Sequence, residues 1–386
     1  MGEFIPLSVP NLKGNELSYV TEIIQNEWVS TGGNMISRFE EEFAKYLKVE
    51  TAAACQSGTA AIHLALRIAC IGYGDEVIVP TLTFIAAVNP VRYVNADPIF
   101  MDCDDSLCMD TEKLREFCSS YCELINGVLV NKKTRKSVKA IIVVHVFGNM
   151  AGMEEIMQIA HQYNLIVIED ATEALGTYFT SGIYKGKFAG TIGHFGAYSF
   201  NGNKIITTGG GGMLVARDSQ MVKHAKYLST QAKDDDVNFI HNEVGYNYRM
   251  TNVQAAIGVA QLEQLEGFIY TKIKNYKLYR DGFTNESNIT MMEFREKVRS
   301  NHWFYSLVLK TGKKEELIKY LAQNNIQSRP IWGLIHEQKP YQEYFSYKII
   351  KSKIYHETIV NLPCSTNLLE DDLYRVIQII KQFVNK

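Results

Sequence analysis

The sequence lacks a large excess of charge of either sign. Its 40 Lys and Arg residues nearly balance 42 Asp and Glu residues, which gives a formal net charge of −2. A charge that small attracts neither nucleic acid nor an anionic membrane surface. We therefore expect no nucleic acid among the partners of this chain. Its 386 residues have an ordinary globular composition, with 46% hydrophobic and 21% charged residues.

Long apolar runs are also missing. No run approaches the roughly 18 residues that a membrane-spanning helix needs. The first ten residues, MGEFIPLSVP, have no basic flank followed by an apolar core, so they do not resemble a signal peptide. Pro6 stands where a myristoylation signal requires Ser or Thr. We expect a cytoplasmic protein with no membrane partner.

Paired cysteine motifs are absent as well. The seven cysteines, an odd number, fit reduced thiols better than a disulfide framework. Cys103, Cys108, Cys118 and Cys122 raise the question of zinc. They are separated by four, nine and three residues, however, which does not match the paired spacing of zinc knuckles. We expect no metal site.

What the sequence does contain is an alternation of helical and strand patterns. Helices are predicted at 58–70 and near 152–163, and strands at 77–79, 140–147 and 165–168. This rhythm indicates an α/β fold with a mostly parallel sheet covered by helices. Ligands of such sheets bind beyond the carboxyl ends of the strands.

The pattern changes after about residue 260. Charged helices are predicted at 262–279 and 314–324, and a shorter strand at 303–309. We therefore expect a large domain, 1–260, which includes the N-terminal segment, and a small C-terminal domain, 261–386.

Lys204 lies in an apolar segment, residues 199–212, with the sequence SFNGNKIITTGGGG. Desolvation among Phe200, Ile205 and Ile206 would lower the pKa of its amine and make it a nucleophile, as Schiff-base chemistry requires. Taken alone, the segment favours a simpler alternative, in which the lysine stem packs and the ammonium reaches water.

Two further segments carry polar groups at the expected edge of the sheet. Gln56-Ser-Gly-Thr59 precedes a helix, where backbone N–H groups bind anions such as phosphate, although taken alone this segment favours an ordinary Ser/Thr cap. Val167-Ile-Glu-Asp-Ala171 is a strand ending in two carboxylates, and side-chain alternation places Glu169 and Asp170 on opposite faces. One of them can hold a protonated ring nitrogen; a helix-capping Asp is the alternative.

A phosphate site, a carboxylate for a ring nitrogen and a reactive lysine are the groups that pyridoxal phosphate needs. With these segments in this order, the chain resembles the DegT/StrS family of sugar aminotransferases from Trp28-Val-Ser-Thr-Gly32 to Leu362-Pro-Cys-Ser365. The family-like stretches are PTLTFIAAVNP (80–90), VHVFGNMAGM (144–153), VIEDATEALG (167–176), GYNYRMTNVQAAIG (245–258) and RPIWGLIH (329–336).

The resemblance implies a pyridoxal-phosphate-dependent transferase of fold type I, the aspartate-aminotransferase-like fold. Its large domain has a mostly parallel, seven-stranded-type sheet, and its smaller C-terminal domain is α+β. Lys204 matches the lysine that forms the internal aldimine with pyridoxal 5'-phosphate. Asp170 matches the partner of the pyridine nitrogen.

The remaining site residues are also implied by the resemblance. Phosphate contacts fall on Ser57, Gly58, Thr59 and Ser199. Phe84 falls where an aromatic ring covers the cofactor, and Glu173 falls where many members carry Gln near the cofactor hydroxyl. Asn247 matches an asparagine that reaches the neighbouring subunit's phosphate, which implies a homodimer with shared active sites. The alternative for Asn247 is a turn residue in Tyr246-Asn-Tyr248.

The resemblance further implies the reaction. Some relatives carry His at the lysine position and remove oxygen from their substrate; this chain keeps Lys204, which favours transamination. The implied donor is glutamate, and the implied acceptor is a nucleotide-linked 4-keto-6-deoxy sugar aminated at C4 for surface-glycan biosynthesis. A cofactor-binding homologue without turnover and a lyase or decarboxylase are the alternatives.

The most detailed expectation concerns the identity of the sugar substrate. The segment around Lys204, Asn131-Lys-Lys-Thr and Ser300-Asn-His-Trp303 look most like the subgroup that acts on UDP-2-acetamido-2,6-dideoxy-4-ketohexoses. GDP-4-keto-6-deoxymannose, which gives perosamine, is the rival. Trp303, Trp332 and His336 are candidates for a wall against the N-acetyl group.

Three basic features have simpler interpretations. His63 lies in an apolar helical segment and is expected to be a packed core residue. The basic cluster 131–136 is expected to form a solvated loop, with contact to a nucleotide phosphate as the alternative. For His145, plain packing and a role at the site wall or just behind it stay equally open.

Overall fold

The computed structural model describes residues 3–385. Its helices are α1 (Glu16–Gln25), α2 (Asn34–Leu47), α3 (Gly58–Ile68), α4 (Asn89–Tyr93), α5 (Thr111–Glu116), α6 (Met153–Tyr163), α7 (Ser219–Ser229), α8 (Asn252–Leu262), α9 (Leu265–Gly282), α10 (Lys314–Gln323), α11 (Lys351–Thr358) and α12 (Glu370–Val384). Its strands are β1 (Ala53–Cys55), β2 (Asp75–Pro80), β3 (Asp97–Met101), β4 (Cys122–Ile125), β5 (Val128–Asn131), β6 (Ser137–Val144), β7 (Ile166–Asp170), β8 (Tyr178–Phe179), β9 (Phe195–Ser199), β10 (Gly212–Ala216), β11 (Lys233–Asp235), β12 (Ile240–His241), β13 (Ile289–Met291), β14 (Val298–Arg299), β15 (Tyr305–Leu309), β16 (Arg329–Pro330), β17 (Ser346–Tyr347) and β18 (Ile359–Leu362).

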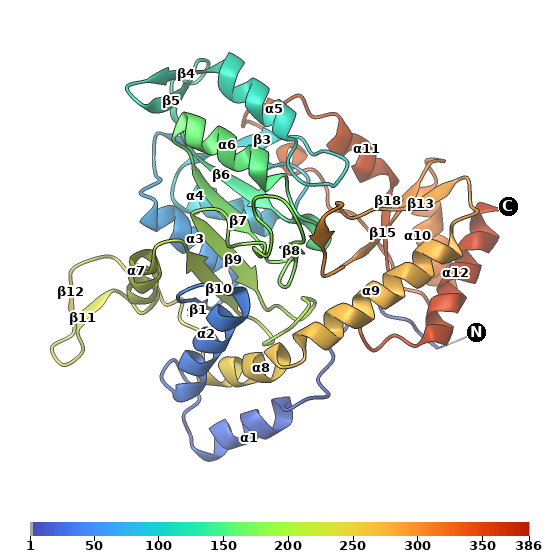
Figure 1. The fold of residues 1–386 in the computed structure, drawn as a ribbon, viewed down its shortest axis with the longest axis horizontal. Coiled ribbons are helices and arrows are strands. Elements are labelled where there is room, and N and C mark those ends of the chain that lie inside the picture. Colours follow the sequence, from blue (N-terminus) through green and yellow to red (C-terminus); the bar gives the residue numbers. More distant parts are fainter. Residues whose placement is uncertain (1–2, 386) are drawn as a thin grey trace.

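The main sheet is mostly parallel, as predicted. Its strands follow the order β1-β10-β9-β7-β6-β2-β3-β17 (Figure 1), and every pair from β9 to β17 is parallel. Only β10 runs antiparallel to its neighbours along this path. The path from β1 to β3 contains the seven strands that the family resemblance implies. β17 extends it, and the β4–β5 hairpin pairs with β6.

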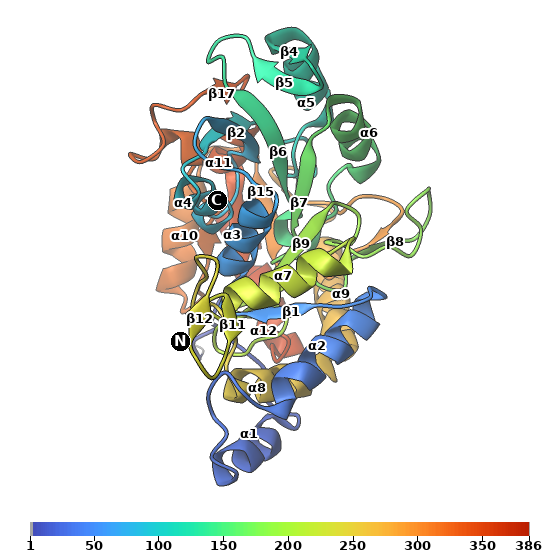
Figure 2. The same ribbon diagram turned by 90° about the vertical axis from the view of Figure 1, so that its left-hand side faces the viewer.

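Both faces of this sheet are buried, because helices cover each of them. On β2, Val77 and Val79 pack into a core cluster with α3, α4 and α7, whereas Ile78 packs into the cluster on the opposite face. Figure 2 shows α3 and α7 in front of the sheet, with α6 on its other side. Burial on both faces explains why the strands read as continuous apolar runs.

A second, smaller sheet lies in the C-terminal part of the chain. It has the antiparallel order β13-β15-β18-β16 and packs with α9, α10 and α12. In Figure 1, α9 runs from the large sheet toward this small sheet. The N-terminal segment lies beside this part of the chain, because Ile5 bridges to Ile326 and the Cys364 N–H donates to the Leu7 carbonyl at 2.8 Å.

Two predicted strands stop short of an expected boundary, although the first of them, Ser137–Val144, is as long as predicted because it begins earlier. The strand predicted at 140–147 ends at Val144, because Phe147 has a left-handed backbone with φ of 54° inside a 3₁₀ turn. The strand predicted at 303–309 begins at Tyr305. Both shortened ends lie next to the cavity described below, since Phe147 and Trp303 line it.

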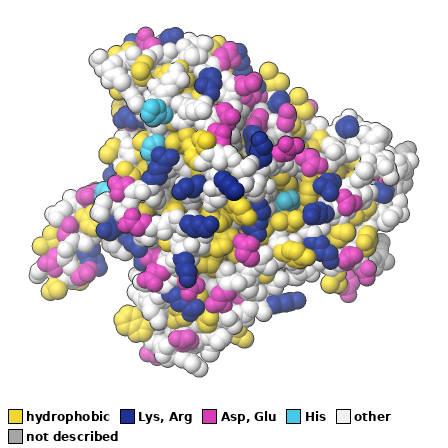
Figure 3. All heavy atoms as spheres, in the orientation of Figure 1, with side chains coloured by type: hydrophobic (Ala, Val, Ile, Leu, Met, Phe, Trp, Pro, Cys, Tyr) yellow, Lys and Arg dark blue, Asp and Glu magenta, His cyan; other side chains and the backbone are white. Residues whose placement is uncertain are grey.

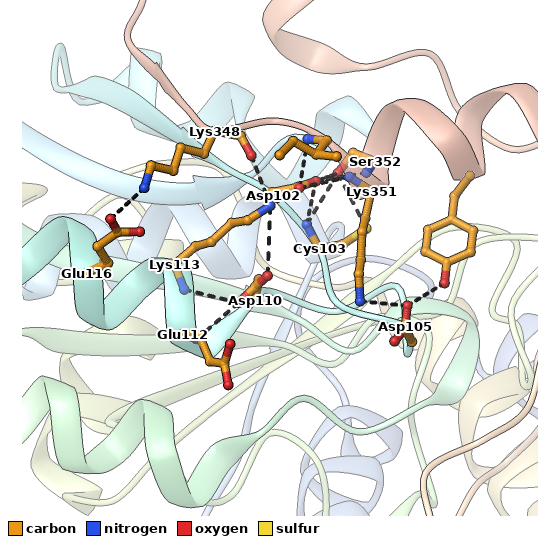
Figure 4. A network of polar contacts seen from close by, with 12 residues as sticks. Asp102, Cys103, Asp105, Asp110, Glu112, Lys113, Glu116, Lys348, Lys351 and Ser352 are labelled. Atoms are coloured by element: carbon orange, nitrogen blue, oxygen red, sulfur yellow. Dashed lines mark hydrogen bonds and ion pairs between the residues drawn. The ribbon is translucent and has the colours of Figure 1, made fainter.

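Asp102, just after β3, ties the large sheet to α11 (Figure 4). Its Oδ1 accepts the Ser352 N–H at 2.8 Å, and its Oδ2 accepts the Lys351 N–H at 2.9 Å. Lys113 Nζ donates to the same carboxylate at 2.5 Å. Burial opposes the charged form, but the hydrogen bonds from Lys113, Ser352 and the Ile350 N–H outweigh it and lower the pKa of Asp102 to about 2.

The surface carries charges of both signs, which Figure 3 shows interspersed on one face. The β11–β12 hairpin projects from the body of the molecule (Figures 1 and 2). It exposes apolar side chains, with Val237 83% and Phe239 72% exposed. Between residues 3 and 385, the structure has no helix with the length and apolar character needed to span a membrane.

Candidate active site

A cavity of about 910 Å³ lies between the two sheets. It is lined by residues from the end of β7, the start of α3, the segment around Lys204 and the C-terminal part of the chain. Eight of the nine predicted site residues line it: Ser57, Gly58, Thr59, Phe84, Asp170, Glu173, Ser199 and Lys204. The structure therefore brings together three segments, around Ser57, Asp170 and Lys204, that are far apart in the sequence.

One end of the cavity is the N-terminus of α3. Ser57 is its N-cap, and the Ser57 hydroxyl accepts the Ala60 N–H at 3.1 Å, so the capping interpretation is correct. The N–H groups of Gly58 and Thr59 are in the first turn, where no carbonyl of the helix can accept them. They line the cavity and carry the positive end of the helix dipole, which suits a phosphate group.

The glycine run after Lys204 lies beside this end of the cavity. Gly212 begins β10 and pairs with Cys55 of β1. A Cβ atom on Gly212 would lie 2.4 Å from the carbonyl carbon of Ser57, a distance that no real side chain tolerates. Glycine at this position therefore lets the Ser57 turn approach β10 closely.

The two carboxylates at the end of β7 face opposite sides, as predicted. Asp170 lines the cavity, where burial raises its pKa and its Oδ1 accepts the Thr172 N–H at 3.0 Å. Glu169 points away and accepts the N–H groups of Gly190 at 2.9 Å and Ile192 at 2.6 Å. A carboxylate as buried as Asp170 is stabilised by a cationic partner, so it fits a protonated ring nitrogen.

His145 belongs to the support of this strand rather than to the cavity wall. Its Nδ1 accepts the Ala151 N–H at 3.1 Å, which leaves the proton of the neutral ring on Nε2. Nε2 lies 2.8 Å from the Glu169 carboxylate and donates to it. Both side chains are fully buried, and His145 is not among the residues that line the cavity.

Lys204 has two close neighbours in the cavity. Its Nζ lies 3.8 Å from Oε1 of Glu173 and 4.1 Å from the ring centroid of Trp303. Burial lowers the pKa of the Lys204 amine, while the Glu173 and Asp170 carboxylates oppose that shift. Burial also raises the pKa of Glu173 to about 7. The other oxygen of Glu173 accepts the Phe147 N–H at 2.8 Å.

Two cavity residues lie where the sequence alone did not place them. Trp303 contacts Lys204 with its ring, although the sequence suggested only a substrate wall for it. Arg329 lines the cavity as an exposed cation, yet it appeared only as part of the segment RPIWGLIH. Trp332 also lines the cavity, whereas His336 lies outside it and contacts the Thr81 hydroxyl at 2.6 Å.

Asn247 is the predicted site residue that lies outside the cavity. Its neighbours Tyr246 and Tyr248 stack on each other and pack against His63, which is buried, as expected of a core residue. The Asn247 residue itself is exposed. The structure of one chain thus places it at the surface, near the base of the β11–β12 hairpin.

The other sequence features lie away from the site. The basic cluster 131–136 forms the turn between β5 and β6, as expected, and none of its residues lines the cavity. Cys103, Cys108, Cys118 and Cys122 are buried free thiols, and burial raises the pKa of each. Among residues 3–385, no three His, Cys, Asp or Glu side chains group as a metal site would require.

Known proteins with this architecture match nearly the whole chain. The model of the DegT/DnrJ/EryC1/StrS aminotransferase family matches residues 10–381. The putative pyridoxal phosphate-dependent aminotransferase EpsN of Bacillus subtilis is 36% identical, over 98% of this chain and 96% of its own. GDP-perosamine synthase of Escherichia coli O157:H7 is also 36% identical, over 99% of both chains. The crystal structure of a DegT DnrJ EryC1 StrS aminotransferase from Brucella abortus superposes with a TM-score of 0.87 at 26% identity, covering 96% of each chain.

The chain belongs to the DegT/DnrJ/EryC1/StrS aminotransferase family. It is an enzyme of the aminotransferase class, and its cofactor is pyridoxal phosphate. The family resemblance, the fold class and the cofactor predicted from the sequence are thereby confirmed.

Proposed function

We propose that this enzyme transfers an amino group from glutamate to C4 of a nucleotide-linked 4-keto-6-deoxy sugar. The observation that carries the proposal is the single cavity in which Lys204, Asp170 and the α3 N-terminus meet, in a chain of this aminotransferase family. A relative of 36% identity named GDP-perosamine synthase supports a sugar nucleotide as acceptor.

The residues that would hold the cofactor lie on three sides of the cavity. Ser57, Thr59 and the N–H groups at the start of α3 would bind its phosphate, together with Ser199. Asp170 would hold the proton of the ring nitrogen, and Phe84 would pack on the ring face. When bound, pyridoxal phosphate supplies an electron-accepting ring that stabilises negative charge at the substrate carbon.

Lys204 would do the proton chemistry. Burial lowers the pKa of its amine, and this favours the neutral form that a nucleophile and base requires. It would remove a proton from the donor carbon, carry it to the cofactor side, and return it to the sugar carbon in the second half of the cycle. The enclosed wall of Phe147, Trp303 and Trp332 would exclude water from that step.

For the acceptor, we propose a UDP-2-acetamido-2,6-dideoxy-4-ketohexose. The resemblance of the segments around Lys204 and Ser300–Trp303 to that subgroup supports it, as do the apolar faces of Trp332 and Phe304 in the cavity. The named GDP-perosamine synthases support GDP-4-keto-6-deoxymannose as the rival acceptor. Arg329, a cation at the cavity wall, would bind the diphosphate in either case.

We also propose a homodimer with shared active sites. Asn247 is exposed and lies outside its own cavity, and the nearby hairpin exposes Val237 and Phe239. A second copy that covers these apolar side chains would bring Asn247 to the neighbour's phosphate site. The division into domains 1–260 and 261–386 stays part of the proposal, supported by the second sheet between residues 289 and 362.

The role of Lys204 can be tested by trapping the cofactor. Reduction of the loaded protein with borohydride, followed by peptide mass mapping, should place a cofactor adduct on Lys204. Lys272 is the internal control, because it is buried, at 3% exposed, and burial lowers its pKa too. An adduct on Lys272 or on any other lysine would refute the assignment.

The acceptor can be tested by a direct competition of substrates. With glutamate as donor, release of 2-oxoglutarate separates transamination from a lyase reaction and from a homologue without turnover. We expect the UDP-N-acetyl substrate to be preferred by at least about tenfold in kcat/KM, since groups paired with one base are left unpaired by the other. Equal or faster turnover of the GDP sugar would establish the rival.

A further inference from the structure

Trp303 contacts the Lys204 segment in two ways. The face of its ring lies 4.1 Å from the Lys204 Nζ. Its indole N–H donates to the carbonyl of Asn203, the residue before the lysine, at 2.7 Å. One side chain from the C-terminal part of the chain therefore fixes both the backbone beside Lys204 and the position of its amine.

The Trp303 side chain is itself held firmly. Its backbone N–H donates to Asn301 Oδ1 at 3.0 Å, and its carbonyl accepts Lys272 Nζ at 2.7 Å. Its ring packs against Phe304 and Phe147, and the residue is only 3% exposed. These contacts hold Trp303 at the cavity wall beside Lys204.

Glu173 lies close to the same amine, with its Oε1 3.8 Å from Nζ. The Asn301 side chain links this residue to Trp303. Its Nδ2 donates to the Glu173 carbonyl at 3.0 Å, while its Oδ1 holds the Trp303 N–H. A single side chain therefore ties the backbones of Glu173 and Trp303 to each other.

An ammonium group in a buried cavity needs partners, because desolvation of an isolated charge is costly. An indole ring is the best aromatic partner for a cation, and its contribution grows when water is excluded. In a pyridoxal-phosphate aminotransferase, the lysine is released from the cofactor during the reaction. When its free amine then carries a proton, it is an ammonium group. Within the described residues, the charged groups recorded as acting on Lys204 are Glu173 and Asp170.

We propose that Trp303 is a positioning residue for Lys204. Its ring and the Glu173 carboxylate together bind the released ammonium. Its indole N–H holds the backbone beside Lys204, so that the amine stays next to these two groups. This goes beyond the proposed function, and it rests on Lys204 being the lysine that bonds the cofactor. Trapping with borohydride tests that premise separately, since the trapping does not depend on Trp303.

The test measures the Lys204 amine in its released state. The full chain is loaded with pyridoxamine 5'-phosphate, which cannot bond the lysine, and is labelled with acetic anhydride over a range of pH. Peptide mass mapping then gives the labelling rate and hence the pKa of Lys204. Replacing Trp303→Leu should lower this pKa by about one unit, because the ammonium loses a desolvated ring partner. Trp303→Phe should lower it by about half as much, since phenyl is a weaker partner than indole.

Trp332→Leu is the matched control. Trp332 lines the same cavity and packs on Phe147 at 4.6 Å, but the structure records no contact between it and Lys204 among the described residues. Leu keeps this part of the wall apolar, so the replacement should shift the Lys204 pKa by less than Trp303→Leu does. If Trp303→Leu fails to load pyridoxamine phosphate, the Phe variant alone decides. A shift no larger than that of the control overturns the proposal.

Discussion

The Oδ1 atom of Asn301 lies where a side chain on Gly148 would begin, 1.9 Å from the position that a Cβ would take. Gly148 also has a left-handed backbone with φ of +88°. The Gly148 carbonyl accepts the hydroxyls of Thr177 and Ser300, at 2.9 and 2.7 Å. The segment that carries Asn301 and Trp303 thus packs directly against Gly148, a position that requires glycine.

Gly148→Ala should therefore destabilise the protein severely. We expect a loss of about 3 kcal/mol or more in the apparent free energy of unfolding by urea, because backbone strain and overpacking act together. Gly74→Ala is the matched control, since Gly74 has φ of +87° and nothing within 4 Å of an added Cβ. Gly74→Ala should lower the free energy of unfolding by only about 1 kcal/mol, because only the left-handed backbone conformation is unfavourable there. Equal losses would mean that the contact with Asn301 is not tight.

Acid should weaken the junction that Asp102 forms with α11. The pKa of Asp102 is lowered from 3.8 to about 2, so its contribution to stability is present above about pH 4 and is lost as the pH falls through 2. Asp102→Ala should cost about 3 kcal/mol at pH 7, because it leaves Lys113 and several N–H groups without their acceptor. Urea unfolding at pH 7 measures the loss of stability that Asp102→Ala causes.

Asp105 provides the control for that experiment. It accepts Lys351 Nζ and the Tyr355 hydroxyl of the same helix, but its side chain is 77% exposed. Asp105→Ala should change stability by less than about 0.5 kcal/mol, as exposed ion pairs do. A loss as large as that of Asp102→Ala would show that α11 docking depends on contacts other than the buried carboxylate.

Glu173 should make the cofactor-free protein less stable in mild alkali. Its pKa is raised to about 7 in the folded chain against 4.5 as the ordinary value, so stability from this group is lost as the pH rises from about 4.5 through 7. Glu173→Gln should therefore stabilise the protein by about 1–2 kcal/mol more at pH 8 than at pH 5. Urea unfolding of the cofactor-free chain at both pH values checks this, and an equal effect at both would contradict it.

Arg329 should matter for substrate binding rather than for cofactor loading. Arg329→Gln should raise KM for the sugar nucleotide about tenfold or more, which is the loss expected for one hydrogen bond to a charged group. Cofactor absorbance should be unchanged. Arg135→Gln is the control, because Arg135 lies in the basic cluster 131–136 and pairs with Glu123 away from the cavity. A rise in KM for Arg135→Gln instead would move the phosphate contact to that cluster.

The shared-site proposal predicts recovery of activity on mixing inactive chains. When Lys204→Ala and Asn247→Ala protomers are exchanged, half of the dimers are mixed and one of their two sites is complete. Activity should then return to about one quarter of the wild-type level. Mixing Lys204→Ala with Asp170→Ala is the control, because both residues come from the same chain and no complete site can form. Recovery in neither mixture would mean that each site is built from one chain.

Local rules were sufficient for much of the fold and part of the site. Alternation along a strand correctly placed Asp170 in the cavity and Glu169 away from it, and the Ser57 turn caps a helix as its composition indicated. These relationships involve residues close in the chain. They depend on backbone geometry that the sequence specifies directly.

Contacts between distant segments could not be predicted in the same way. Trp303 meets Lys204 because the small sheet packs beside the large one, and 98 residues separate them along the chain. The Phe147 N–H reaches Glu173 through a left-handed backbone at a non-glycine residue, for which the sequence gives no signal. Phe147 is a bulky residue in a conformation that favours glycine, so tertiary packing rather than local preference sets it.

β17 has a consequence for anyone who would divide this protein into fragments. Ser346 and Tyr347 pair with Phe100 and Met101 of β3, so a strand from late in the chain closes an edge of the large sheet. A fragment that ends near residue 260 would leave β3 as an open, apolar edge, and such edges recruit other chains. Truncation should therefore yield aggregates, and adding the missing segment as a peptide should restore solubility only if it can seal that edge.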